Sequence, residues 1–231
     1  MGGHGMERQD EFYTKVAKLS RQLTIKGFLM VSGGGPGAME ATHLGAYFAA
    51  RPEKELEDAI KQIKVRPNNS EPGKEYKDKD WLHRAWRVMK KYPIKKGDEI
   101  KSISLGIPTW LYGHEPPAPF ATHIGKYFAN SVREEGLLAI AKHGVIFAPG
   151  SAGTTQEIFQ DATQNHYGSM GYISPMILFG VKRWTEERPL WDFLQKVSKG
   201  KMYGELLSLT DDENEIIRRI LSYNPEIYKV K

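Results

Sequence analysis

The sequence contains no cysteine among its 231 residues. This absence excludes disulfide bonds, thiolate metal sites and a cysteine nucleophile, and it agrees with a cytoplasmic protein. No apolar run approaches the roughly 18–20 residues that span a bilayer, so we expect no membrane segment. Residues 1–5 lack the charged and apolar regions of a secretory signal and are typical of a vector remnant, with Met6 as the natural start.

A large excess of one charge is also missing. The 33 lysines and arginines exceed the 28 acidic residues by only five, and most of them alternate with acids, as on a solvated surface. No basic stripe with interleaved aromatic residues is present, so we expect no nucleic-acid partner. Hydrophobic residues make up 40% of the chain, which is ordinary for a globular protein with a core. The length predicts a single domain over residues 1–231.

Short apolar runs alternate with amphipathic stretches along the chain. This order predicts an α/β protein with a Rossmann-like, three-layer fold around a mostly parallel sheet. A charged region at about 51–100 holds too few apolar residues for its own core, and we interpret it as an insertion. The ligand site of such a fold lies at the carboxyl ends of the strands. The expected strands are 27–32, 102–107, 144–148, 175–180 and 206–209. The main expected helices are 10–26, which Asp10 caps, 38–50, 191–197 and a last helix that Asp211 or Asp212 caps. Leu56, Ile60 and Ile63 indicate one short helix within the insertion.

Two junctions between a strand and a helix are rich in glycine, at 33–37 and 149–155. Glycine lets backbone N–H groups approach a ligand closely, and the first turn of the next helix offers unpaired N–H donors and the positive end of the helix dipole. Such a junction binds anions, although each could also be only a tight turn. Two such loops at the same edge of one sheet favour the binding of a phosphorylated ligand by both loops together.

These two loops carry a resemblance to a known family. The stretch 33–41, Gly-Gly-Gly-Pro-Gly-Ala-Met-Glu-Ala, resembles the first motif of the LOG family of nucleotide phosphoribohydrolases, and 149–157 resembles its second, Pro-Gly-Gly-x-Gly-Thr-x-x-Glu. The similarity covers about 12–50 and 102–220. It implies a Rossmann-like fold and an enzyme that hydrolyses the N-glycosidic bond of a nucleoside 5′-monophosphate. We expect neither a cofactor nor a metal. It also implies a homodimer or higher homo-oligomer, for which the region 120–142 is our candidate contact.

The resemblance implies two catalytic residues, Glu157 and Arg133. Breaking the bond between C1′ and nitrogen builds positive charge on the ribose, which a carboxylate beside the sugar stabilises. Glu157 lies one helical turn beyond Thr154, where a first-turn acid could also merely complement the helix dipole. Arg133 either binds the ligand through its planar fork or pairs on the surface with Glu134 or Glu135.

The remaining expected site residues are all in or beside the two loops. Trp110 to Glu115 form a further candidate, since they could stack on a base, although packing of a proline-rich loop is the alternative. The scattered histidines show no metal-ligand spacing. The expected substrate-binding residues are Gly33, Gly34, Gly35, Gly37, Met39, Glu40, Pro149, Gly150, Ser151, Gly153, Thr154 and Thr155.

The chain departs from the family pattern at several places. Glu134 follows the arginine where the family has lysine, Gln156 stands where many members have a second acid, and Ser151 and Ala152 replace the usual glycine and its neighbour. The family's first strand, before Asp10, is missing, so either the chain is a fragment or another segment fills that place. The sequence therefore predicts a hydrolase and leaves a non-catalytic nucleotide sensor as the alternative.

Overall fold

The computed structural model describes residues 1–64, 71–110 and 117–230. The chain divides into two compact units. The N-terminal unit comprises Gly3–Arg133, and the C-terminal unit comprises Glu134–Lys231 together with Met1–Gly2. The expectation of a single domain stays a prediction.

The N-terminal unit contains a three-stranded parallel sheet in the order β1-β2-β3. Val31 of β1 lies opposite Leu105 of β2, and Leu105 lies opposite His123 of β3. The elements of this unit are α1 (Glu11–Ile25), β1 (Met30–Ser32), α2 (Ala38–Tyr47), α3 (Glu53–Ile63), the 3-10 turns η1 (Glu75–Lys77) and η2 (Ile100–Ser102), α4 (Trp81–Lys91), β2 (Ser104–Gly106) and β3 (His123–Ile124); α5 (Asn130–Ile140) begins here and continues into the C-terminal unit.

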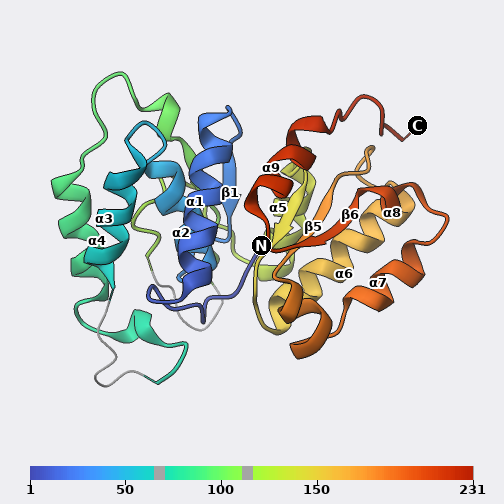
Figure 1. The fold of residues 1–231 in the computed structure, drawn as a ribbon, viewed down its shortest axis with the longest axis horizontal. Coiled ribbons are helices and arrows are strands. Elements are labelled where there is room, and N and C mark those ends of the chain that lie inside the picture. The colour runs from blue at the N-terminus through green and yellow to red at the C-terminus, as the bar shows by residue number, and fades with distance from the viewer. Residues whose placement is uncertain (65–70, 111–116, 231) are drawn as a thin grey trace. The chain divides into compact units, whose positions relative to one another are not determined.

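Helices α1 and α2 lie side by side next to β1 (Figure 1). The Asp10 side chain caps α1 by accepting a hydrogen bond from the Phe12 N–H, as its position in the sequence predicts. Close packing of the two helices depends on Gly45, because a Cβ there would lie 2.1 Å from the Ala17 carbonyl oxygen. The glycine thus lets the two helix backbones approach each other.

The region 51–100 packs within the N-terminal unit. Its helices α3 and α4 contact each other, and each buries one apolar stripe. Leu56, Ile60 and Ile63 form the stripe of α3, which the spacing of these residues predicts. On α4, Trp81 and Val88 are buried, while Trp86 remains exposed.

The C-terminal unit contains a second three-stranded parallel sheet, in the order β4-β5-β6. Figure 1 shows α9 on one side of β5 and β6, and α6 and α7 on the other. Met1 lies beside β4: its N-terminal nitrogen donates to the Ile146 carbonyl and its own carbonyl accepts from the Ala148 N–H, as in one rung of a parallel ladder. The elements are β4 (Val145–Phe147), α6 (Ala152–Tyr167), β5 (Met176–Phe179), the π-helical turn η3 (Arg183–Glu187), α7 (Trp191–Ser198), α8 (Met202–Leu206), β6 (Leu207–Thr210) and α9 (Glu213–Ser222).

The α/β fold class with all-parallel strands and a Rossmann-like alternation of elements is confirmed. The described strands form two sheets, where the sequence analysis expects one. β1 is also shorter than the apolar run 27–32, because Leu29 is exposed and pairing begins only at Met30. β3, α8 and the turns η1, η2 and η3 are additional to the expected elements.

Candidate functional site

The first glycine-rich loop begins at Ser32, the last residue of β1. The Gly34 N–H donates to Ser32 Oγ at 3.2 Å, and Nε2 of His43 lies 2.8 Å from the same oxygen. Nδ1 of His43 lies 3.1 Å from Ser104 Oγ, so the buried imidazole joins β1 to β2. Burial lowers the pKa of His43 to about 4, which keeps the ring neutral at neutral pH. This network fixes the entry into the loop.

Arg133 and Met39 both lie against this loop. A Cβ at Gly33 would be 2.2 Å from Arg133 Nη1 and 2.7 Å from Met39 Sδ. A Cβ at Gly35 would be 2.7 Å from Met39 Cε. The structure thus brings four of the predicted site residues together within the N-terminal unit, and the missing side chain of Gly33 makes room for the guanidinium.

The beginning of α2 differs from the expectation of unpaired first-turn donors. The Ala38 N–H donates to the Gly3 carbonyl at 3.2 Å. Gly37 has a φ of 70°, and a Cβ there would lie 2.4 Å from the same carbonyl oxygen. The segment expected to be a vector remnant therefore packs on the loop, and one donor of this helix end already has a partner.

Glu40 is held entirely inside the protein. Its carboxylate binds Arg8, with Nη2 at 2.5 Å and Nε at 2.9 Å, and accepts a hydrogen bond from the Tyr13 hydroxyl at 2.9 Å. The Arg8 N–H donates in turn to both carboxylate oxygens of Glu75, a residue of the insertion. Burial raises the pKa of Glu75 to about 7. These contacts give Glu40 a role in anchoring α2. No local sequence pattern marks Arg8 as the partner of this carboxylate.

The second glycine-rich loop lies between β4 and α6 in the C-terminal unit. Ser151 precedes the helix but makes no side-chain capping bond, and both Ser151 and Ala152 are exposed. Thr155 donates to the Ser151 carbonyl through its N–H at 3.1 Å and its hydroxyl at 3.2 Å, while Thr154 is buried. The start of this 16-residue helix is therefore accessible to an anion.

Arg183 is a cation at this loop that sequence reasoning missed. Its guanidinium donates to the Gly150 carbonyl and also pairs with Glu187 at 3.0 Å. It follows β5 by a few residues, at the same end of the sheet as the loop after β4. The sequence could have indicated Arg183, because a basic residue just after the fourth expected strand lies at the carboxyl end of that strand, where ligands bind in this fold.

Glu157 lies on the buried side of α6, with only 7% of its surface exposed. Asp161 follows one turn later and is buried too. Its Oδ1 accepts from Asn165 Nδ2 at 3.2 Å, whereas Oδ2 has no hydrogen-bond partner among the described residues. Burial raises the pKa of Asp161 to about 8, so it is largely protonated at neutral pH. The helix thus presents two acids on one buried face.

Two departures from the family pattern contact each other. Gln156 Nε2 donates to Glu134 Oε2 at 2.7 Å, from α6 to α5. This hydrogen bond joins α5 to α6 within the C-terminal unit and gives the buried Glu134 a structural partner.

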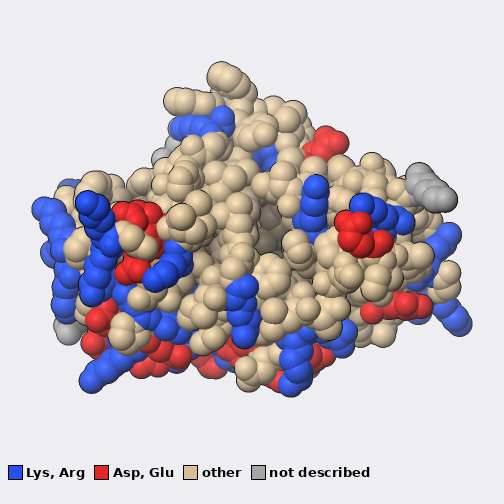
Figure 2. Space-filling view, turned by 90° about the horizontal axis from the view of Figure 1, so that it is seen from above, with Lys and Arg blue, Asp and Glu red and all other residues tan. Residues whose placement is uncertain are grey.

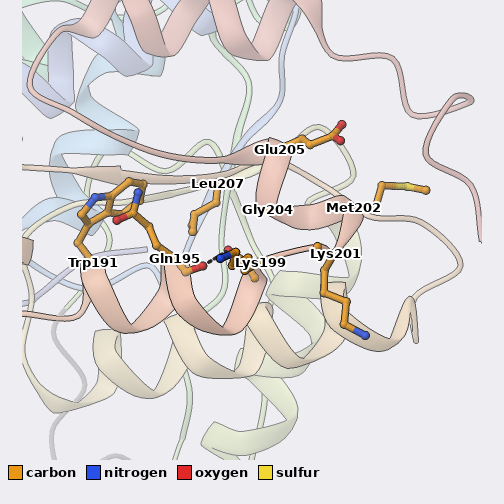
Figure 3. A pocket seen from close by; sticks show the side chains of 10 residues that line it. Trp191, Gln195, Lys199, Lys201, Met202, Gly204, Glu205 and Leu207 are labelled. Carbon is orange, nitrogen blue, oxygen red and sulfur yellow. Dashed lines mark hydrogen bonds between the residues drawn. The ribbon is translucent and has the colours of Figure 1, made fainter.

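A pocket of about 450 Å³ lies between α7 and α8 (Figure 3). Lys199 and Lys201 line it, together with Gln195, whose carbonyl accepts a hydrogen bond from Ser198. No predicted site residue lines this pocket. It is a hollow at the turn between two helices, separate from the glycine-rich loop of its unit.

Metal clusters and membrane-spanning helices are absent from the described part of the chain. Acidic and basic side chains are intermixed on the face in Figure 2, as their alternation in the sequence predicts. Across residues 1–64, 71–110 and 117–230, no group of three or more His, Asp or Glu is placed to hold a metal ion. Every helix in those ranges is too short or too polar to cross a membrane. Of the stacking candidate Trp110 to Glu115, only Trp110 lies within the described residues.

No family model matches the chain, and no curated protein matches it. The two loops and the acids and bases beside them are therefore the basis for a functional proposal.

Proposed function

We propose that this chain is a nucleotide phosphoribohydrolase of the LOG type, acting on a nucleoside 5′-monophosphate. In the reaction the bond between C1′ and the base nitrogen breaks, water adds its oxygen to C1′, and the released proton goes to the base. The products are a free base and ribose 5-phosphate. The resemblance to the family also supports a cytoplasmic homo-oligomer, and sedimentation of the purified chain tests the oligomeric state.

The observation that carries the proposal is the buried position of Glu157 just after an open, glycine-rich helix start. Removed from bulk water, a carboxylate interacts more strongly with the positive charge that develops on the ribose. The accessible first turn of α6 suits an anionic group. Within the N-terminal unit, Arg133, held against Gly33, is by itself a candidate contact for an anionic group.

Incubation with a panel of nucleoside monophosphates, followed by an assay for ribose 5-phosphate, tests the proposal. We expect Glu157→Gln to lower kcat by about 10²–10⁴-fold, as for loss of a group that acts on the reacting centre. Glu186→Gln is the matched control, because Glu186 is an exposed carboxylate of the same unit. Turnover by the wild type that survives Glu157→Gln undiminished would remove Glu157 from the mechanism.

A non-catalytic nucleotide sensor is the second candidate. Glu134 favours it, because this acid replaces a basic residue next to Arg133. The hydrogen bond from Gln156 weakens that argument, since it gives Glu134 a structural partner. Tight nucleotide binding with no turnover of any member of the panel would establish the sensor and exclude the hydrolase.

A further inference from the structure

Two segments of the N-terminal unit extend the sheet beyond the ends of β2 and β3. The Gly125 N–H donates to the Gly106 carbonyl at 3.0 Å, and the Tyr127 N–H donates to the Pro108 carbonyl at 3.0 Å. The Trp110 N–H then donates to the Tyr127 carbonyl at 2.9 Å. This pairing sets the segment that holds Trp110 beside the segment that holds Lys126 and Phe128.

The pairing brings two exposed aromatic rings together. The planes of Trp110 and Phe128 are inclined by 25°, and the ring centroids are 6.4 Å apart. Aromatic carbons in direct contact lie about 3.5–4.0 Å apart, so at this separation the rings cover little of each other's faces. Trp110 is 51% exposed and Phe128 is 74% exposed. The two side chains thus form an exposed aromatic pair beyond the ends of β2 and β3.

These rings lie at the same sheet edge as the first glycine-rich loop. Strands β1, β2 and β3 are parallel neighbours, so the segments that follow them leave the sheet at one edge. Pro108 packs on this loop, because a Cβ at Gly34 would lie 2.9 Å from Pro108 Cδ. Trp110 is two residues further along. The other side of the loop is next to the guanidinium of Arg133.

We propose that Trp110 and Phe128 form the stacking subsite for the base of the nucleotide, which rests on the proposed function. A base has a flat π-face, and aromatic side chains bind it through that face. The order along this edge, from guanidinium through glycine-rich loop to aromatic pair, matches the order of phosphate, ribose and base in a nucleotide. The class of ligand is therefore one with a planar ring at the end opposite its phosphate.

The ammonium of Lys126 lies 3.6 Å from the centre of the Trp110 ring. An exposed cation–π contact strengthens an interaction by a factor of about 2–5, whereas stacking of a base on an aromatic side chain strengthens binding by a factor of about 5–150. A base therefore replaces the ammonium on the indole face. Lys126 is then at the rim of the stacked ring, where the ring nitrogens and exocyclic oxygens accept hydrogen bonds.

Calorimetric titration of the full chain with adenosine 5′-monophosphate and, separately, with ribose 5-phosphate tests the subsite. We expect Trp110→Ala and Phe128→Ala to weaken binding of the nucleotide by about 5–150-fold and binding of ribose 5-phosphate by less than 2-fold. Trp110→Phe retains a ring and should restore most of the nucleotide affinity. Trp86→Ala is the matched control, because Trp86 is 53% exposed on α4 of the same unit.

Three results would overturn the subsite. Nucleotide affinity equal to that of the wild type in Trp110→Ala is the first, and an equal loss for nucleotide and ribose 5-phosphate is the second. The third is a Phe128→Ala variant whose sedimentation coefficient changes while its nucleotide affinity stays that of the wild type. That result would make the aromatic pair a contact between copies of the chain. The proposed function fails separately, when the wild type binds nucleotide and releases no ribose 5-phosphate. A wild type that binds no nucleotide overturns both.

Discussion

Gly33→Ala should abolish the placement of Arg133 while leaving the arginine in the chain. The added Cβ would lie 2.2 Å from Arg133 Nη1 and 2.7 Å from Met39 Sδ, both ends of flexible side chains. Both can move away, so we expect a stability loss of only about 1–2 kcal/mol, within the range for overpacking. Under the proposed function, the displaced guanidinium would lose a charged hydrogen bond to the ligand, worth about 1.5–3 kcal/mol, which is a 10- to 150-fold fall in kcat/KM.

The assay is ribose 5-phosphate release by Gly33→Ala, Arg133→Ala and the double variant, with denaturation midpoints measured in parallel. Because both single changes remove the same contact, the double variant should be no worse than Arg133→Ala. Gly125→Ala is the control, since its Cβ would meet nothing closer than Leu105 at 3.9 Å. Fully additive losses, or wild-type activity in Gly33→Ala, would refute the reasoning that Gly33 serves Arg133.

Three further predictions concern stability. Gly45→Ala should cost about 3 kcal/mol in urea denaturation, because its Cβ would lie 2.1 Å from a backbone oxygen of α1, and the gain in helix propensity of about 1 kcal/mol does not offset this. Glu75 should contribute stability below pH 4.5 that is lost as the pH rises to about 7, up to about 3 kcal/mol. Glu75→Gln should remove that pH dependence of the unfolding free energy, whereas the control Glu11→Gln should not, because the Glu11 side chain is 82% exposed. If Glu75→Gln leaves the slope of unfolding free energy against pH unchanged, the buried environment of Glu75 is contradicted. Finally, Glu134→Lys and Gln156→Glu should each destabilise by about 1–2 kcal/mol, and their combination should recover at least half of the summed loss in a double-mutant cycle; additivity would show that the 2.7 Å contact contributes nothing.

The elements that the sequence predicts correctly are those with local signals. The cap at Asp212, whose side chain accepts from the Asn214 N–H, precedes a stripe of isoleucines and can be recognised from a few neighbouring residues. β3 has no such signal, because both of its residues are exposed at the edge of the sheet and no apolar run marks it. The division into two sheets is a matter of which strands pair across long separations, which no local pattern contains.

The same reasoning explains which parts of the candidate site the sequence can predict. Glu40 and Glu157 are both acids that closely follow a glycine-rich loop, so pattern alone treats them alike. Glu40, however, has its carboxylate bound by Arg8 and Tyr13, at separations of 32 and 27 residues along the chain. Breaking a buried ion pair costs several kcal/mol, so this carboxylate stays with Arg8 when a ligand arrives. A motif therefore locates an acidic residue near the ligand, but long-range pairing decides whether that residue can act on it.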